Sequence, residues 1–261
     1  MTRESRPSRD RLTPGVTGWV LVATLVLLGP GVASAHAADA SFTLDFGNAY
    51  IWRGIVLNDD GVMQFGLDAS PLMVGSVPIG FSVWGNYDIG DYGGTIQGSE
   101  ISELDLAVYA GLPYGFEVGY VEYQFPQTEF GDTREFYVTW SKDLVITPTV
   151  SFYYDFGEVN SGYGSLDLAY AFPFQGKFSL GVGGLVALAG KGWGEIVGGT
   201  KGGFYNYDAY ATAGYQVSEA FGLQARGGYS GTLDTEVLPE QPLGGYFLAG
   251  VTFTVCRPWN S

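Results

Sequence analysis

The side chains that most often carry enzyme chemistry are few in this chain and poorly placed for it. The single histidine, His36, lies among small residues that fit a signal-peptidase site, which argues against a Ser–His pair or a histidine metal ligand. Glu103 and Asp105 could act as a general acid and a general base. However, any two residues that are two positions apart in a strand point to the same face, so their spacing alone does not indicate catalysis. Lys191 lies between glycines without a following Ser or Thr, so it marks no phosphate-binding loop. We therefore expect no enzyme, no cofactor site and no metal site.

One segment could instead bind a cation. Asp59 and Asp60 precede Gly61, and paired carboxylates at a loop can bind Ca²⁺. Asp-Gly is also a strong turn signal, and we favour the turn, with Ca²⁺ binding as the alternative. Cys256 is the only cysteine, so no intrachain disulfide can form.

The dominant pattern is an alternation of apolar residues with small or polar ones along segments of roughly ten residues. Between residues 178 and 188, Phe178, Leu180 and Val182 fall on one face, and the small residues between them fall on the other. Twelve such segments, the first over residues 42–52, predict an all-β protein, a single up-and-down antiparallel transmembrane β-barrel. Errors in segment boundaries leave ten strands as the alternative.

The N-terminus predicts an export signal. Four arginines precede an apolar run at 19–28, which is too short to span a bilayer as a helix. Small residues at 33, 35 and 37 fit a cleavage site. We expect residues 1–37 to be a cleaved secretory signal peptide and 38–261 to be the barrel, with strands over about 41–255 and a tail at 256–261. An exported barrel implies the outer membrane of a Gram-negative bacterium, with its lipid and the barrel-assembly machinery as partners.

The connections alternate in length, as in outer-membrane barrels. Residues 112–114, 173–177 and 217–220 are tight turns, whereas 88–98, 189–203 and 231–242 are long loops. The loop at 57–61 falls on the side of the barrel where the long outer loops are expected, but it is short and departs from this trend.

Composition separates this barrel from a secreted soluble one. A soluble β-protein usually carries lysine on its polar face, but the four lysines all fall in predicted turns or loops, and we expect no Arg or Lys on the apolar face. Aromatic residues cluster near the strand ends, where lipid headgroups would lie. We expect two girdles made of Tyr50, Trp52, Tyr87, Trp140, Tyr154, Phe172, Phe178, Tyr207, Tyr215, Phe221 and Tyr229.

The opposite face is acidic. The chain has 27 acidic and 12 basic residues and a net charge of −15, which argues against a nucleic-acid partner. Alternation directs ten carboxylates and two arginines inward. Inward glycines and alanines leave room between them, and inward aromatic residues take some of it back: Trp84, Tyr109, Tyr137, Tyr153 and Tyr210. We expect Arg53 and Arg226 to set a constriction with nearby members of this set: Asp45, Asp68, Asp88, Glu103, Asp105, Glu117, Glu135, Asp155, Asp167 and Asp208.

A resemblance supports the same interpretation. Tyr50, Trp52, Arg53 and Gly54 form an aromatic-x-aromatic-Arg-Gly step, and a polar turn and Gln64 follow. This opening resembles that of the TorF-like porins, which implies an outer-membrane barrel of porin type without an established substrate. One feature departs from such barrels: the last aromatic of the final strand, Phe253, is not terminal.

These patterns predict a porin-like function. A narrow acidic lumen would pass small cationic or neutral solutes, because rings of Asp and Glu favour cations. The alternative is a closed structural or surface barrel whose inward charges form a buried network. The sequence leaves the solute and the oligomeric state open.

Overall fold

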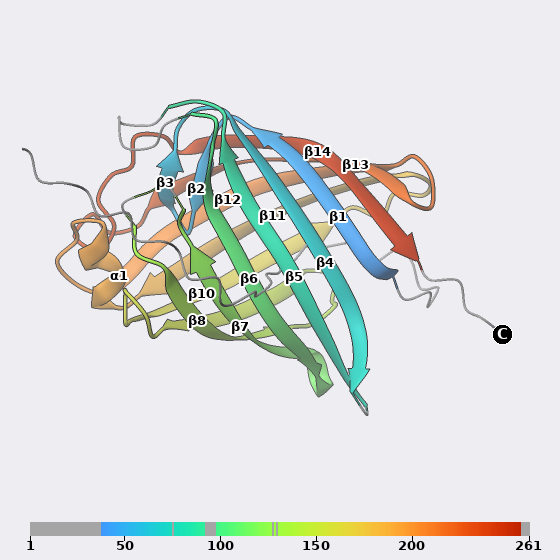
Figure 1. Cartoon of the computed structure of the whole chain (residues 1–261), viewed down its shortest axis with the longest axis horizontal. Helices are drawn as coiled ribbons and strands as arrows, with labels where there is room; N and C mark the ends of the chain where they lie inside the picture. The colour runs from blue at the N-terminus through green and yellow to red at the C-terminus, as the bar shows by residue number, and fades with distance from the viewer. Residues whose placement is uncertain (1–37, 75, 92–97, 127, 129, 257–261) are drawn as a thin grey trace, which may run out of the picture.

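In a computed structural model that describes residues 38–74, 76–91, 98–126, 128 and 130–256, the chain forms one closed antiparallel barrel of twelve strands (Figure 1). Each strand pairs with the next along the chain, and β1 closes the wall by pairing with β14 and β4. The wall consists of β1 (Ala38–Gly47), β4 (Val62–Val74), β5 (Val77–Asp88), β6 (Glu100–Leu112), β7 (Phe116–Gln124), β8 (Thr133–Ser141), β9 (Thr147–Asp155), β10 (Gly162–Ala171), β11 (Phe178–Ala189), β12 (Gly203–Gln216), β13 (Phe221–Thr232) and β14 (Gly245–Cys256).

The predicted all-β barrel and its twelve strands are confirmed. The predicted signal peptide and the end of the tail lie outside the described residues. Within the described part of the chain, no helix is long and apolar enough to cross a membrane. The short helical elements are a 3-10 turn, η1 (Pro113–Gly115), and α1 (Lys191–Ile196).

The prediction for the first strand was wrong beyond Gly47. We expected residues 42–52 to form one strand and 57–61 to form a short loop, but the wall strand ends at Gly47. Residues 50–58 form a separate hairpin, β2 (Tyr50–Trp52) and β3 (Ile55–Asn58), outside the barrel sheet. Asn48 accounts for this break, because its Oδ1 accepts the backbone N–H of Phe247 at 2.6 Å and holds the chain at the rim.

Two members of the predicted girdles therefore do not lie on the outer wall. Tyr50 is 6% exposed and packs on Trp84, with ring centroids 5.3 Å apart. Trp52 packs on Tyr123 and Trp193. The physical reason is the break after Gly47, which removes both residues from the alternation of the first strand.

Apolar side chains cover the outer wall along its strands. Phe42, Leu168, Val182 and Phe253 are each at least 40% exposed, as expected for a face against lipid. The rim carries charge, contrary to our expectation for this face. Glu122 of β7 lies opposite Arg134 of β8 in the strand register, two positions from Tyr120 and Phe136, which also lie opposite each other. All four residues therefore share the outer face.

The end of the barrel that carries the long loops has its own apolar core. Trp193 of α1 packs there with Tyr205 and with Val237 and Leu238 from the loop after β13, and each is at most 1% exposed. Figure 1 shows β2, β3 and α1 together at this end, opposite the end at which β14 finishes. This loop core, with β2 and β3 beside it, narrows one mouth of the barrel.

Exposed charges tie the loops of this mouth together. Lys201 Nζ lies 3.0 Å from Asp234 Oδ2 and 2.5 Å from Glu236 Oε2. Hydrogen bonds to Glu236 and Asp234 raise the pKa of Lys201, and the hydrogen bond from Lys201 lowers the pKa of Asp234.

The turn at Asp59 and Asp60 is also formed, with Asp60 N–H donating to Asn58 Oδ1 at 2.8 Å.

A charge placed on the outer wall should destabilise the barrel. Val182 lies near the middle of β11 and is 43% exposed. We expect Val182→Arg to lower the free energy of unfolding by about 2–4 kcal/mol, because a lipid-facing arginine is poorly solvated. Urea unfolding in vesicles measures this change. Glu219→Arg, in an exposed turn, is the control, and equal effects of both would contradict a lipid-facing wall.

Candidate channel lumen

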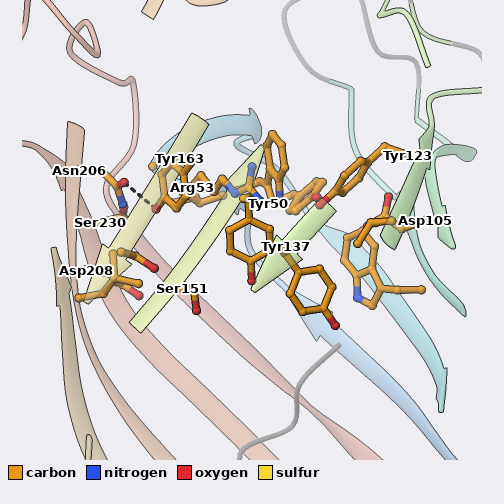
Figure 2. A pocket seen from close by; sticks show the side chains of 18 of the residues that line it. Tyr50, Arg53, Asp105, Tyr123, Tyr137, Ser151, Tyr163, Asn206, Asp208 and Ser230 are labelled. Carbon is orange, nitrogen blue, oxygen red and sulfur yellow. Dashed lines mark hydrogen bonds between the residues drawn. The ribbon is translucent and has the colours of Figure 1, made fainter. Parts of the chain in front are cut away.

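A cavity of about 530 Å³ lies inside the barrel. The hairpin β2–β3 forms part of its lining through residues 50–54, and inward side chains from strands around the barrel form the rest. Figure 2 shows Arg53 near the middle of this group, with Asn206 and Asp208 to one side and Tyr123 and Asp105 to the other. The hairpin thus lies within the lumen.

The hairpin contacts much of the inner circumference. Tyr50 meets Trp84 of β5, and Trp52 meets Tyr123 of β7. At the turn, a Cβ on Gly54 would lie 2.6 Å from Cβ of Asn206 on β12, so only glycine fits there. Val56 N–H donates to Gln241 Oε1 at 3.0 Å. These contacts span the lumen from β5 to β12 and to the loop before β14.

Arg53 makes the strongest polar contact of the hairpin. Its Nη1 and Nη2 atoms donate to the two carboxylate oxygens of Glu135 on β8, at 2.6 and 2.8 Å. The Arg53 side chain is 9% exposed and that of Glu135 is fully buried. Tyr123 Oη donates a further hydrogen bond to Glu135 at 2.8 Å. This bidentate pair is therefore screened from water and geometrically fixed.

Tyrosines satisfy many of the inward carboxylates through a repeated three-strand arrangement. Tyr210 of β12 lies over Gly183 of β11, and its Oη donates to Asp167 of β10 at 2.9 Å. The same arrangement recurs twice. Tyr109 lies over Gly80 and donates to Asp68, and Tyr246 lies over Gly228 and donates to Asp208. Tyr137 lies over Gly119 and donates to Glu117 on that same strand.

These contacts show how the room above the inward glycines is used. We expected inward tyrosines to take back part of that room, and tyrosine rings cover Gly80, Gly119, Gly183 and Gly228. A glycine lets a ring from the paired strand lie across the wall, since any Cβ would collide with it. The rings therefore lie against the inner wall, and their hydroxyl groups donate to the inward carboxylates.

Arg226 of β13 lies in a second cluster that also lines the cavity. Its Nη2 donates to Asp208 at 3.0 Å, and its Nε donates to Tyr246 Oη at 3.1 Å. Its guanidinium carbon lies 3.8 Å from the ring centroid of Tyr210. Both arginines of the predicted constriction thus line the cavity and each is bound to one carboxylate.

The predicted lumen acids fall into different environments. Asp105, Glu117 and Asp208 line the cavity. Asp45 accepts the amide of Gln224. Glu103 is buried, and its Oε1 and Asp105 Oδ1 have no hydrogen-bond partner among the described residues.

Two of these acids have structural partners instead. Asp155 does not line the cavity, because its Oδ1 accepts three backbone N–H groups of the loop after β9, those of Gly157, Val159 and Asn160. Asp88 accepts hydrogen bonds from the amides of Asn58 and Asn86. Both fix the loop end of the barrel.

Sequence reasoning missed the inward hairpin and the aromatic group around Arg53. Asn48 interrupts the alternation, and Arg53-Gly54 has the composition of a turn, so a local signal was present. The positions of Tyr163 and Trp193 beside Arg53 carried no such signal, because they come from β10 and from a distant loop.

Comparisons with known proteins give the class of the fold. No protein-family model matches the chain, and no curated protein matches it by sequence. An outer-membrane channel of Pseudomonas putida F1 is similar in structure, with a TM-score of 0.52 and 11% identity over 87% of this chain and 99% of that chain. The chain has the fold of an outer-membrane channel. KdgM, a porin solved in complex with disordered oligogalacturonate, is 8% identical over 82% of this chain and 98% of its own, at a TM-score of 0.48.

Removing the charge of Glu135 should loosen the hairpin. In Glu135→Gln, the buried Arg53 guanidinium would lose its counter-charge, which typically costs about 3–5 kcal/mol. We expect a lower free energy of unfolding and a weaker near-UV signal from Trp52 and Trp193. Glu117→Gln, which removes a carboxylate with one tyrosine partner, should cost only about 1 kcal/mol. Similar losses for both variants would refute a special role of the Arg53–Glu135 pair.

Proposed function

We propose that the protein is a narrow outer-membrane channel that passes small cationic or neutral solutes and has no catalytic role. The observation that carries this proposal is the charge balance of the lumen. Both inward arginines are already bound to carboxylates, whereas Asp105 and Glu117 line the cavity and form no ion pair with any described residue. Water or a passing cation must solvate such groups, because unpaired buried charge is costly.

The lining of the cavity supports passage as well. Hydroxyl groups of Thr139, Thr149, Ser151 and Ser165 face it together with the tyrosines. A polar, hydroxylated wall exchanges hydrogen bonds with hydrated solutes at little cost. Arg53 and Arg226 both line this space and, in this proposal, set its narrowest part.

The hairpin and the loop core favour a second candidate, a closed barrel with a structural or surface role. Together they fill much of the lumen at the long-loop end. In the channel proposal the same hairpin is a constriction that limits passage to small solutes.

Membership of the TorF-like porins forms part of this proposal. The Arg-Gly step that carries the resemblance occupies the turn of the lumen hairpin, where Arg53 binds Glu135. This position would explain why that step recurs at the start of such proteins.

Bilayer recordings of the refolded protein distinguish the candidates. Discrete conductance steps are expected of a channel, and their complete absence would leave the closed barrel. Under a salt gradient we expect a reversal potential that indicates cation preference, because uncompensated carboxylates attract cations.

The carboxylates that face the cavity should determine this selectivity. We expect the double variant Asp105→Asn/Glu117→Gln to lower the cation-to-anion permeability ratio by about twofold or more. Glu122→Gln removes a carboxylate from the outer face and should leave the ratio unchanged. Anion preference in the unmodified protein would contradict the proposed acidic pathway.

A further inference from the structure

Arg53 occupies a site with the features of a receptor for an organic cation. Its guanidinium carbon lies 4.3 Å from the ring centroid of Tyr153, 4.6 Å from those of Trp52 and Tyr163, and 5.0 Å from that of Trp193. Glu135 closes the site with two hydrogen bonds. Aromatic faces around a carboxylate bind guanidinium and ammonium groups through cation–π and charge-assisted contacts. We call Glu135, Tyr153, Tyr163 and Trp193 the cation box.

The walls of the cation box do not belong to the hairpin. Glu135 lies on β8, Tyr153 on β9, Tyr163 on β10 and Trp193 on α1. Tyr163 Oη also donates to Asn206 on β12 at 3.1 Å (Figure 2). The box is therefore part of the wall and the loop core, and the hairpin only inserts a side chain into it.

The backbone of the hairpin turn is poorly suited to arginine. Arg53 has φ +49° and Gly54 has φ +81°, so both central residues are left-handed. Two-residue turns of this kind favour Asn-Gly, and a left-handed non-glycine residue other than Asn or Asp costs about 1–2 kcal/mol. Arginine at this position is thus explained by its side chain rather than by the turn.

The lumen repeats this chemistry around Arg226, which lies against Tyr210 and binds Asp208. Two guanidinium groups of the protein therefore bind the lumen wall in the same way, each through an aromatic face and a carboxylate. Such a wall would bind a solute that carries the same group.

We propose that the cation box is the recognition site for a guanidinium- or ammonium-bearing solute, and that Arg53 is its tethered occupant. The inference rests on the proposed channel and names its substrate class. A solute cation that takes the place of Arg53 frees the hairpin turn from Glu135 and widens the constriction. No covalent step is involved, and the exchange replaces one cation on Glu135 by another.

Arg53→Asn empties the box while keeping the hairpin, because Asn-Gly suits the left-handed turn and the shorter side chain cannot replace Arg53 on Glu135. The probe is guanidinium chloride at low millimolar concentration in detergent micelles. Urea is the matched neutral control, since it has the same planar shape without the charge. The readouts are tryptophan fluorescence and the midpoint of thermal unfolding, and neither depends on conductance.

We expect guanidinium to raise the Tm of Arg53→Asn and to change its tryptophan emission, whereas urea does neither. Arg53→Asn/Glu135→Gln should lose this response. Lys201→Asn removes an exposed cation whose ion-pair partners are the carboxylates of Asp234 and Glu236. This variant should not gain a response to guanidinium. Arg53→Gly serves as a second empty-box variant, because glycine also accepts the left-handed turn.

The two proposals fail in different ways. Equal responses to guanidinium and urea, or a response that persists without Glu135, overturn the cation box even if the protein conducts. A saturable response that needs Glu135, in a protein that never conducts, supports the box and rejects the channel. In a conducting protein, methylguanidinium should raise the open-state current of the unmodified channel, and urea should not.

Discussion

Carboxylates that point into a narrow lumen must be paired or hydrated, and this requirement accounts for most of the interior of the barrel. Three Tyr–Gly–Asp arrangements place a tyrosine hydroxyl on an aspartate two strands away. Each arrangement needs a glycine on the strand between the tyrosine and the aspartate, because a Cβ at that position would collide with the tyrosine ring. The glycine content and the inward tyrosines are thus two parts of one solution for holding acids inside a wall.

The same requirement connects the hairpin to the wall. Glu135 is fully buried, so it needs a cation, and the first turn after β1 supplies it through Arg53. Removing either partner leaves a buried charge, which is why this contact is expected to hold the hairpin more firmly than the apolar contacts beside it. The hairpin also packs through Tyr50, Trp52 and Ile55, so a competing cation would release the turn at Arg53 and not the hairpin as a whole.

Alternation predicted the twelve-strand barrel well, and the inward or outward direction of most strand residues follows from it. It failed where the chain leaves the sheet: Tyr50 and Trp52 continue the parity of Phe42 and Phe46 but belong to the hairpin. Parity is a local property, and it holds only while the strand continues. Asp155 shows a related limit, because its partners are backbone groups of the adjoining loop.

The sequence alone determined the wall of this protein, because a period of two fixes which side chains face lipid and which face the lumen. It also determined the acidic sign of the interior. Only the tertiary structure decided what the interior does with that charge. Arg53 meets Glu135, which lies 82 residues further along the chain, together with Tyr153, Tyr163 and Trp193, because the hairpin turns back into the closed barrel. The alternation along one strand carries no information about such contacts.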